Sequence, residues 1–151
     1  MNIKDKRNVP NNESKNKKLI MGFKIHGKFE LAVQGEIIIA RFYQSWNKEC
    51  AKDFFITYKN FILAQNFKQW GAFVDFRKFE GATPQAIKYF EKITLWAKAN
   101  GIVCRAQITN SKLTEYVANK PSQGQDHSPI KTFKDEVSAF NWLEAQGLTI
   151  K

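Results

Sequence analysis

The segment WGAFVDFRKFEGATP, residues 70–84, predicts a buried strand followed by a loop and a helix. Trp70–Phe76 is almost wholly apolar, which is typical of a central strand that is covered on both faces. Thr83 and Pro84 form a strong helix start, because the hydroxyl can cap the first turn and proline suits the first helical position. We therefore expect Arg77–Thr83 to be the loop between the strand and the helix.

The residues upstream of this segment predict a β-hairpin. Apolar residues recur at every second position over Lys28–Val33, as in a strand with one buried face. Gln34-Gly35 offers a tight turn into Glu36–Tyr43, whose run of three isoleucines indicates a strand covered on both sides. The first strand of the hairpin is expected at an exposed edge of the sheet.

The rest of the chain alternates helices with strands. We expect helices after the capping residues Asn47, Thr83, Ser111 and Asp135, strands over Ile102–Ile108 and Ile130–Phe133, and a polar loop over Pro121–Pro129. The order is β-β-α-β-α-β-α-β-α, and right-handed crossovers between such strands produce a parallel sheet. The prediction is a single α/β domain over residues 21–151. Its sheet is mixed and mostly parallel, with five strands and one antiparallel edge strand.

The chain is strongly basic, with 24 Lys and Arg against 14 Asp and Glu and a formal charge of +10 over 151 residues. Such a charge favours anionic surroundings, which include nucleic acid, acidic lipid and acidic protein faces. Part of the excess lies in residues 1–20, which are rich in Asn, Lys and Ser and predict a disordered basic tail. Met21 offers an alternative start codon.

Several features predict a cytoplasmic protein, with peripheral attachment to the inner membrane surface as the alternative. The two cysteines, Cys50 and Cys104, have no paired framework, which fits a reducing compartment. The N-terminus is too polar for a signal peptide, and no segment is apolar enough to span a bilayer.

Two local patterns in this element order resemble the STAS superfamily, and more closely its SpoIIAA-like branch of small bacterial proteins. One is Val74–Pro84, a strand ending in Asp, then a loop with Phe and Gly, then a helix start. The other is Phe133–Leu143, with Phe and Asp before Ala and Trp-Leu. The match covers roughly residues 27–147. It implies a non-enzymatic module that binds protein partners, in a branch linked to apolar ligands and membrane surfaces.

The sequence departs from the phosphorylated members of this family at one position. Those antagonists carry a serine at the start of the helix after the central strand, whereas this chain has Gly81-Ala82-Thr83-Pro84. Thr83 is the only hydroxyl there, and helix capping explains it better than regulation by phosphorylation.

The best candidate for a ligand or partner site is the Arg77–Thr83 segment. Open α/β sheets usually bind ligands at the carboxyl ends of their strands, and a helix N-terminus offers free amides to an anion. The candidate residues are Arg77, Lys78, Phe79, Glu80, Gly81 and Thr83, with Trp46 from the preceding strand-to-helix connection. The alternative is an ordinary surface loop in which Phe79 folds onto the sheet and Trp46 packs in the core.

Asp75 is unusual in so apolar a strand, because a buried carboxylate needs a cationic or amide partner. We expect a structural ion pair with Arg41 or Arg105, which also lie in strands. A catalytic role for Asp75 is the weaker alternative. No second acid, nucleophile or metal ligand stands beside it in a recognisable motif, so we expect no catalytic residues.

Neither a metal site nor a cofactor is expected. His26 and His127 lie near opposite ends of the fold, and two scattered imidazoles do not bind a metal. Asp126-His127-Ser128 resembles a catalytic triad only in its letters, because a triad requires convergence in space.

Taken together, these features favour a binding module for a protein partner or a small apolar or anionic ligand, with a homodimer as one option for its assembly. The runner-up is association with acidic membrane surfaces through basic residues. Nucleic-acid binding ranks below both, because charge is its only support and no zinc finger, helix-turn-helix or ribonucleoprotein motif is present. An enzyme ranks last.

Overall fold

The computed structural model describes residues 20–24, 27–110 and 128–151. Its elements in chain order are β1 (Ile20–Lys24), β2 (Gly27–Gln34), β3 (Ile37–Trp46), α1 (Lys48–Leu63), β4 (Trp70–Ala82), α2 (Pro84–Ala99), β5 (Ile102–Ile108), β6 (Ile130–Phe133) and α4 (Glu136–Ala145). The predicted helix over Ser111–Lys120, most of the loop Pro121–Pro129 and residues 1–19 of the predicted tail lie outside the described residues. The division into tail and domain stays a prediction.

Side-chain caps begin the three described helices where the sequence predicts them. Asn47 Oδ1 accepts from the amide of Cys50 at 3.0 Å, and Thr83 Oγ1 accepts from the amide of Ala86 at 3.2 Å. Asp135 Oδ1 accepts from the amide of Ser138 at 2.7 Å. Each cap satisfies an amide that has no partner inside its helix, which fixes where the chain turns from strand or loop into helix.

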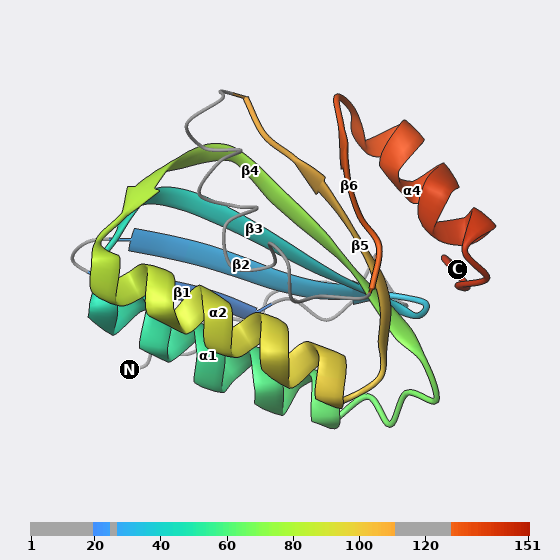
Figure 1. Cartoon of the computed structure of the whole chain (residues 1–151), viewed down its shortest axis with the longest axis horizontal. Coiled ribbons are helices and arrows are strands. Elements are labelled where there is room, and N and C mark those ends of the chain that lie inside the picture. Colours follow the sequence, from blue (N-terminus) through green and yellow to red (C-terminus); the bar gives the residue numbers. More distant parts are fainter. Residues whose placement is uncertain (1–19, 25–26, 111–127) are drawn as a thin grey trace, which may run out of the picture.

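The sheet has the order β1-β2-β3-β4-β5-β6. β1 pairs with β2 and β2 with β3 in antiparallel fashion, and every later pair is parallel. Helices α1 and α2 cover one face of the sheet, and α4 lies against the other face near β5 and β6 (Figure 1). The predicted mixed, mostly parallel α/β fold is confirmed.

One strand was not predicted. β1 pairs outside β2, so the strand expected at the edge of the sheet is the second strand from that edge. The sequence IMGFK has only five residues and a central glycine, which is too short to show a period. The expected edge position of Lys28–Val33 is therefore wrong, although its pairing with β3 through the Gln34-Gly35 turn is confirmed.

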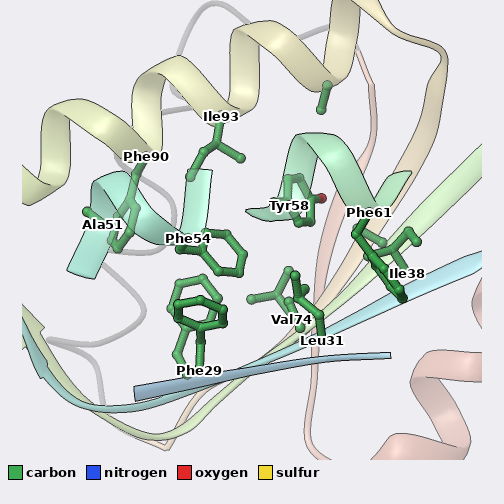
Figure 2. Packing of buried hydrophobic residues seen from close by; sticks show 14 of the residues in the cluster. Phe29, Leu31, Ile38, Ala51, Phe54, Tyr58, Phe61, Val74, Phe90 and Ile93 are labelled. Carbon is green, nitrogen blue, oxygen red and sulfur yellow. The ribbon is translucent and has the colours of Figure 1, made fainter. Parts of the chain in front are cut away.

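The core has two parts, one on each face of the sheet. The larger part lies between the sheet and helices α1 and α2, and it contains Phe54 and Tyr58 of α1, Phe90 of α2 and Phe29 of β2 (Figure 2). The smaller part lies beneath α4. Because β3 contributes side chains to both parts, its three isoleucines are buried on both faces as predicted.

Within the described part of the chain, no helix is long and apolar enough to cross a membrane.

Candidate functional site

The predicted loop after the central strand is itself strand. β4 continues to Ala82 and remains paired with β3, which continues to Trp46. Lys78 lies opposite Tyr43, and Phe79 lies opposite Gln44. The charged residues and glycine of this stretch suggested a loop, but the buried rings of Phe79 on β4 and Trp46 on β3 anchor both strand ends to the core.

Trp46 and Phe79 form part of that anchor. Their exposed fractions are 1% and 3%, and both rings pack with Phe42 in the core under α1 and α2. The Trp46 ring stacks on Phe42 with 4.3 Å between centroids, and its indole N–H donates to the carbonyl of Tyr43 at 3.1 Å. Both side chains therefore pack in the core beneath the strand ends, as in the alternative to a ligand site, and neither is exposed to a partner.

A β-bulge sets the direction of the charged side chains. Arg41 lies opposite Asp75 and Tyr43 opposite Lys78, so Phe42 faces the two residues Phe76 and Arg77. Without the extra residue, Arg77 and Lys78 would point to opposite faces of the sheet. With it, both line the same hollow.

The other predicted site residues follow this bulge along β4 and reach the start of α2. Lys78, Glu80 and Thr83 are exposed and Gly81 is half-buried. Thr83 caps α2, so its hydroxyl already accepts one hydrogen bond. The structure therefore brings Arg77, Lys78, Glu80, Gly81 and Thr83 together at the end of β4.

Asp75 binds two arginines. Arg41 Nη1 lies 2.7 Å from Asp75 Oδ2, and Arg77 reaches the carboxylate through Nε and Nη2, each at 2.9 Å. The amide of Arg77 also donates to Asp75 Oδ1 at 3.0 Å. Of the two arginines considered from the sequence, Arg41 is the one in contact with Asp75, whereas Arg105 donates to Gln107 at 2.8 Å.

Glu136, the first residue of α4, joins the same network. Its carboxylate accepts from Arg41 Nη1 at 2.7 Å and Nη2 at 3.3 Å, and from Arg77 Nη2 at 2.6 Å. This contact could not be predicted from the sequence, because the helix dipole alone explains an acidic residue in the first turn of a helix.

The network keeps both carboxylates ionised. Burial alone would raise the pKa of Asp75, but the hydrogen bonds from Arg77 and Arg41 outweigh it and hold that pKa below its ordinary value. The hydrogen bond from Arg41 is the main reason that the pKa of Glu136 is lowered. Burial opposes the charge on Arg41, yet its bonds to Glu136 and Asp75 leave the pKa of Arg41 raised.

Beside the network lies a hollow of about 380 Å³ on the face of the sheet opposite α1 and α2. Its lining residues are Glu30, Arg41, Phe42, Tyr43, Asp75, Arg77 and Lys78. The Tyr43 hydroxyl donates to Glu30 Oε1 at 2.9 Å, and burial followed by this bond raises the pKa of Tyr43 to about 12. Lys28 Nζ lies 4.6 Å from the centre of the Tyr43 ring.

Sequence reasoning missed Glu30 and Tyr43, although a signal for them was present. The Gln34-Gly35 turn fixes the register of the hairpin, which places Glu30 opposite Arg41 and Lys28 opposite Tyr43. Polar residues directly opposite each other, on the part of this sheet face that α4 does not cover, indicate a polar surface.

Among the described residues, two small hollows lie under α1 and α2. A hollow of about 40 Å³ is lined by Phe42, Phe54 and Phe90 among others, and a neighbouring hollow near Ile130 measures about 20 Å³. Volumes of this size hold one or two waters rather than an apolar ligand.

Other reactive groups of the described residues are buried or dispersed. Cys50 and Cys104 are buried and not joined by a disulfide, and burial raises the pKa of Cys104 to about 11. Across residues 20–24, 27–110 and 128–151, no three side chains of the kinds that bind metals come together. His26 and His127 lie outside the described residues.

Comparison with known proteins identifies the fold. No protein-family model matches the sequence, and no curated protein matches it. Among solved structures, an uncharacterized protein of the DUF3478 family with a SpoIIAA-like fold, from Shewanella loihica, matches with a TM-score of 0.58 and 14% identity over 85% of this chain and 94% of that chain. This chain is SpoIIAA-like in fold.

Two further structures agree with this assignment. The unphosphorylated anti-sigma factor antagonist SpoIIAA matches with a TM-score of 0.56 and 12% identity over 77% of this chain and 97% of that one. The phosphorylated form of the Bacillus cell fate determinant SpoIIAA matches with a TM-score of 0.55 and 13% identity over 76% and 98%. The resemblance seen in the sequence is thus confirmed at the level of the SpoIIAA-like fold.

Proposed function

We propose that this chain is a non-enzymatic, STAS-type binding module that recognises a protein partner through the end of β4. The contact surface consists of the exposed residues Lys78, Glu80 and Thr83 with Gly81 between them. The SpoIIAA-like fold supports the proposal, because one protein with that fold is described as an anti-sigma factor antagonist, a protein that acts by binding. Proteins of one fold can differ in function, so the geometry of this surface is the main support for the proposal.

The observation that carries the proposal is the rigid support beneath this surface. β3 and β4 remain paired to Trp46 and Ala82, and the Phe42, Trp46 and Phe79 rings pack under the strand ends. A surface that is already ordered loses little conformational entropy when a partner binds. An ordered surface of this kind suits recognition of a folded partner.

The small apolar ligand that the family resemblance also implied is not part of this proposal. Two hollows that the described residues form under α1 and α2 measure about 40 and 20 Å³. A ligand large enough to gain affinity from apolar burial needs several hundred Å³.

A matched pair of charge reversals tests the proposal. The tagged chain is purified from its own host, and co-purifying proteins are identified and quantified by mass spectrometry. Glu80→Lys should remove a stoichiometric partner, because reversal of a charge inside a contact surface brings like charges together. Glu144→Lys makes the same change of charge on the exposed side of α4 and should leave that partner bound. Equal recovery from the two variants, or no stoichiometric partner with the wild type, would contradict the proposal.

A further inference from the structure

We infer that the hollow beside the arginine network, which consists of Arg41, Arg77, Asp75 and Glu136, binds a small oxyanion, either a carboxylate or a phosphate. In the absence of the anion, Glu136 takes its place as a partner of the two arginines. This site lies on the sheet face opposite α1 and α2. It goes beyond the proposed function, which requires only the exposed end of β4.

Three cationic side chains converge on the hollow. Arg41 reaches it from β3, and Arg77 and Lys78 reach it from the bulged part of β4. Among the described residues, Arg41 Nε and Arg77 Nη1 donate no hydrogen bond, and Lys78 is exposed and forms no ion pair. Guanidinium donors in a fixed arrangement are well suited to planar and tetrahedral oxyanions.

The two acidic partners of the arginines differ in how firmly they are held. Asp75 has an 11% exposed side chain, accepts from both arginines and belongs to the same strand as Arg77. The Glu136 side chain is 37% exposed and reaches the arginines from a different element. Because an exposed carboxylate regains water when it leaves an ion pair, Glu136 can be replaced at low cost, whereas Asp75 cannot.

The contacts of Glu136 indicate which kind of group the two arginines bind. Its carboxylate bonds to Arg41 and Arg77 at 2.6–3.3 Å, and both guanidiniums also line the hollow. An anion that enters the hollow meets the same donors together with Lys78. The volume of about 380 Å³ lies near the lower end of the range for small-molecule sites, so it admits a small organic acid or phosphate ester.

Replacement of Glu136 has a structural consequence for α4. The carboxylate ties the first turn of that helix to the sheet, whereas Ala139 and Leu143 hold the helix further along. Anion binding should therefore loosen the first turn without detaching the helix. By linkage, any change that loosens this turn should also strengthen anion binding.

The test is a titration of the protein with inorganic phosphate and, separately, with sodium acetate at constant ionic strength. The nuclear magnetic resonance signals of the arginine Nε–H groups report binding. Millimolar phosphate should shift the signals of Arg41 and Arg77. Glu136→Gln should reach half-saturation at an about fivefold lower concentration, the effect of removing one partly exposed competing ion pair. Glu144→Gln removes the same charge from an exposed position of the same helix and should titrate like the wild type. A response to phosphate alone assigns the ligand as a phosphate, a response to acetate alone assigns it as a carboxylate, and a response to both shows that the site binds oxyanions of either kind.

A second pair of variants separates local binding from the general basicity of the chain. Lys78→Ala should raise the half-saturating concentration severalfold, whereas Lys52→Ala, an exposed position on α1, should not. No shift of either arginine signal with phosphate or acetate would overturn the inference, as would equal titrations for Glu136→Gln and Glu144→Gln. Either result leaves the partner surface at Glu80 intact, because its test does not depend on an anion.

Discussion

Asp75 is the residue on which the charged side of the sheet depends. It has little exposed side chain, yet two arginines and one backbone amide satisfy its oxygens. Hydrogen bonds to an ionised group stabilise a fold more than neutral ones, and loss of the Asp75 charge would leave Glu136 as the carboxylate that both arginines still contact. Asp75 is therefore structural here, although it borders the hollow.

Asp75→Asn should lower the free energy of unfolding by about 2 kcal/mol, because the amide keeps the shape of the carboxylate but loses its charge-assisted bonds to Arg41 and Arg77. Urea unfolding followed by tryptophan fluorescence measures this change. Glu80→Gln is the control, since Glu80 is exposed on the same strand. It should change the free energy by no more than about 0.5 kcal/mol. Similar losses for both variants would show that the arginine network contributes nothing to stability.

Stability should also fall in acid because of these carboxylates. The folded chain holds the pKa values of Asp75 and Glu136 below their ordinary values of 3.8 and 4.5, so the unfolded chain binds more protons in this range. The stabilisation is complete above about pH 5 and is lost as the pH falls through the lowered values. Glu136→Gln should flatten the decrease in unfolding free energy between about pH 6 and pH 3 relative to Glu144→Gln. Parallel curves for the two variants would argue against the Glu136 contacts.

The ends of β3 and β4 show how an element can differ from what its own sequence indicates. Charged residues and a glycine predict a loop after Phe76, but Phe79 and Trp46 bury their rings in the core and keep the strands paired. Phe42 lies at the centre, with ring centroids of Trp46, Phe76 and Phe79 within 4.3–5.8 Å. Tertiary packing therefore sets the length of both strands.

Phe42→Ala should destabilise the fold by about 3–5 kcal/mol, the usual cost of removing a buried phenyl ring. It should also increase hydrogen exchange at the amides of Lys78 and Phe79, because their strand loses the packing beneath it. Ile56→Ala, at a 45% exposed position on α1, should cost about 0.5 kcal/mol or less and leave that exchange unchanged. Unchanged exchange in both variants would mean that the strand ends do not depend on the aromatic cluster.

The parts of the fold that follow from short-range rules could be predicted from the sequence. The caps at Asn47, Thr83 and Asp135 and the hairpin turn at Gln34-Gly35 each depend on a few neighbouring residues. The bulge that turns Arg77 and Lys78 to one side could not be predicted, because it reflects how two strands meet around Phe42. The contact between Glu136 and Arg41 spans 95 residues and leaves no local pattern.

At the scale of the whole molecule, the residues after α4 pack against the sheet. Leu148 is buried over Gly71, where an added Cβ would collide with the leucine side chain. The carbonyl of Thr149 accepts from the amide of Glu36 at 2.8 Å, and the amide of Thr149 donates to Glu36 Oε1 at 2.9 Å. α4 is thus tied to the sheet at both ends, through Glu136 at its start and through this segment after its last turn.

Leu148→Ala should reduce the free energy of unfolding by about 2–5 kcal/mol, because the leucine is 2% exposed and little can move into its place. Val137→Ala, at a 72% exposed position of α4, should change the same quantity by about 0.5 kcal/mol or less. Denaturant unfolding of both variants measures the difference. A small effect of Leu148→Ala would show that the C-terminal segment is not needed to hold α4 on the sheet.

Site-specific photocrosslinking in the chain's own host tests most directly whether the end of β4 is a recognition surface. A photoreactive residue is placed at Glu80 in one protein and at Lys52, an exposed position on α1, in another. We predict a discrete crosslinked species of defined mass at position 80 that is absent at position 52. Crosslinks of equal yield and pattern at both positions, or none at position 80, would contradict the account.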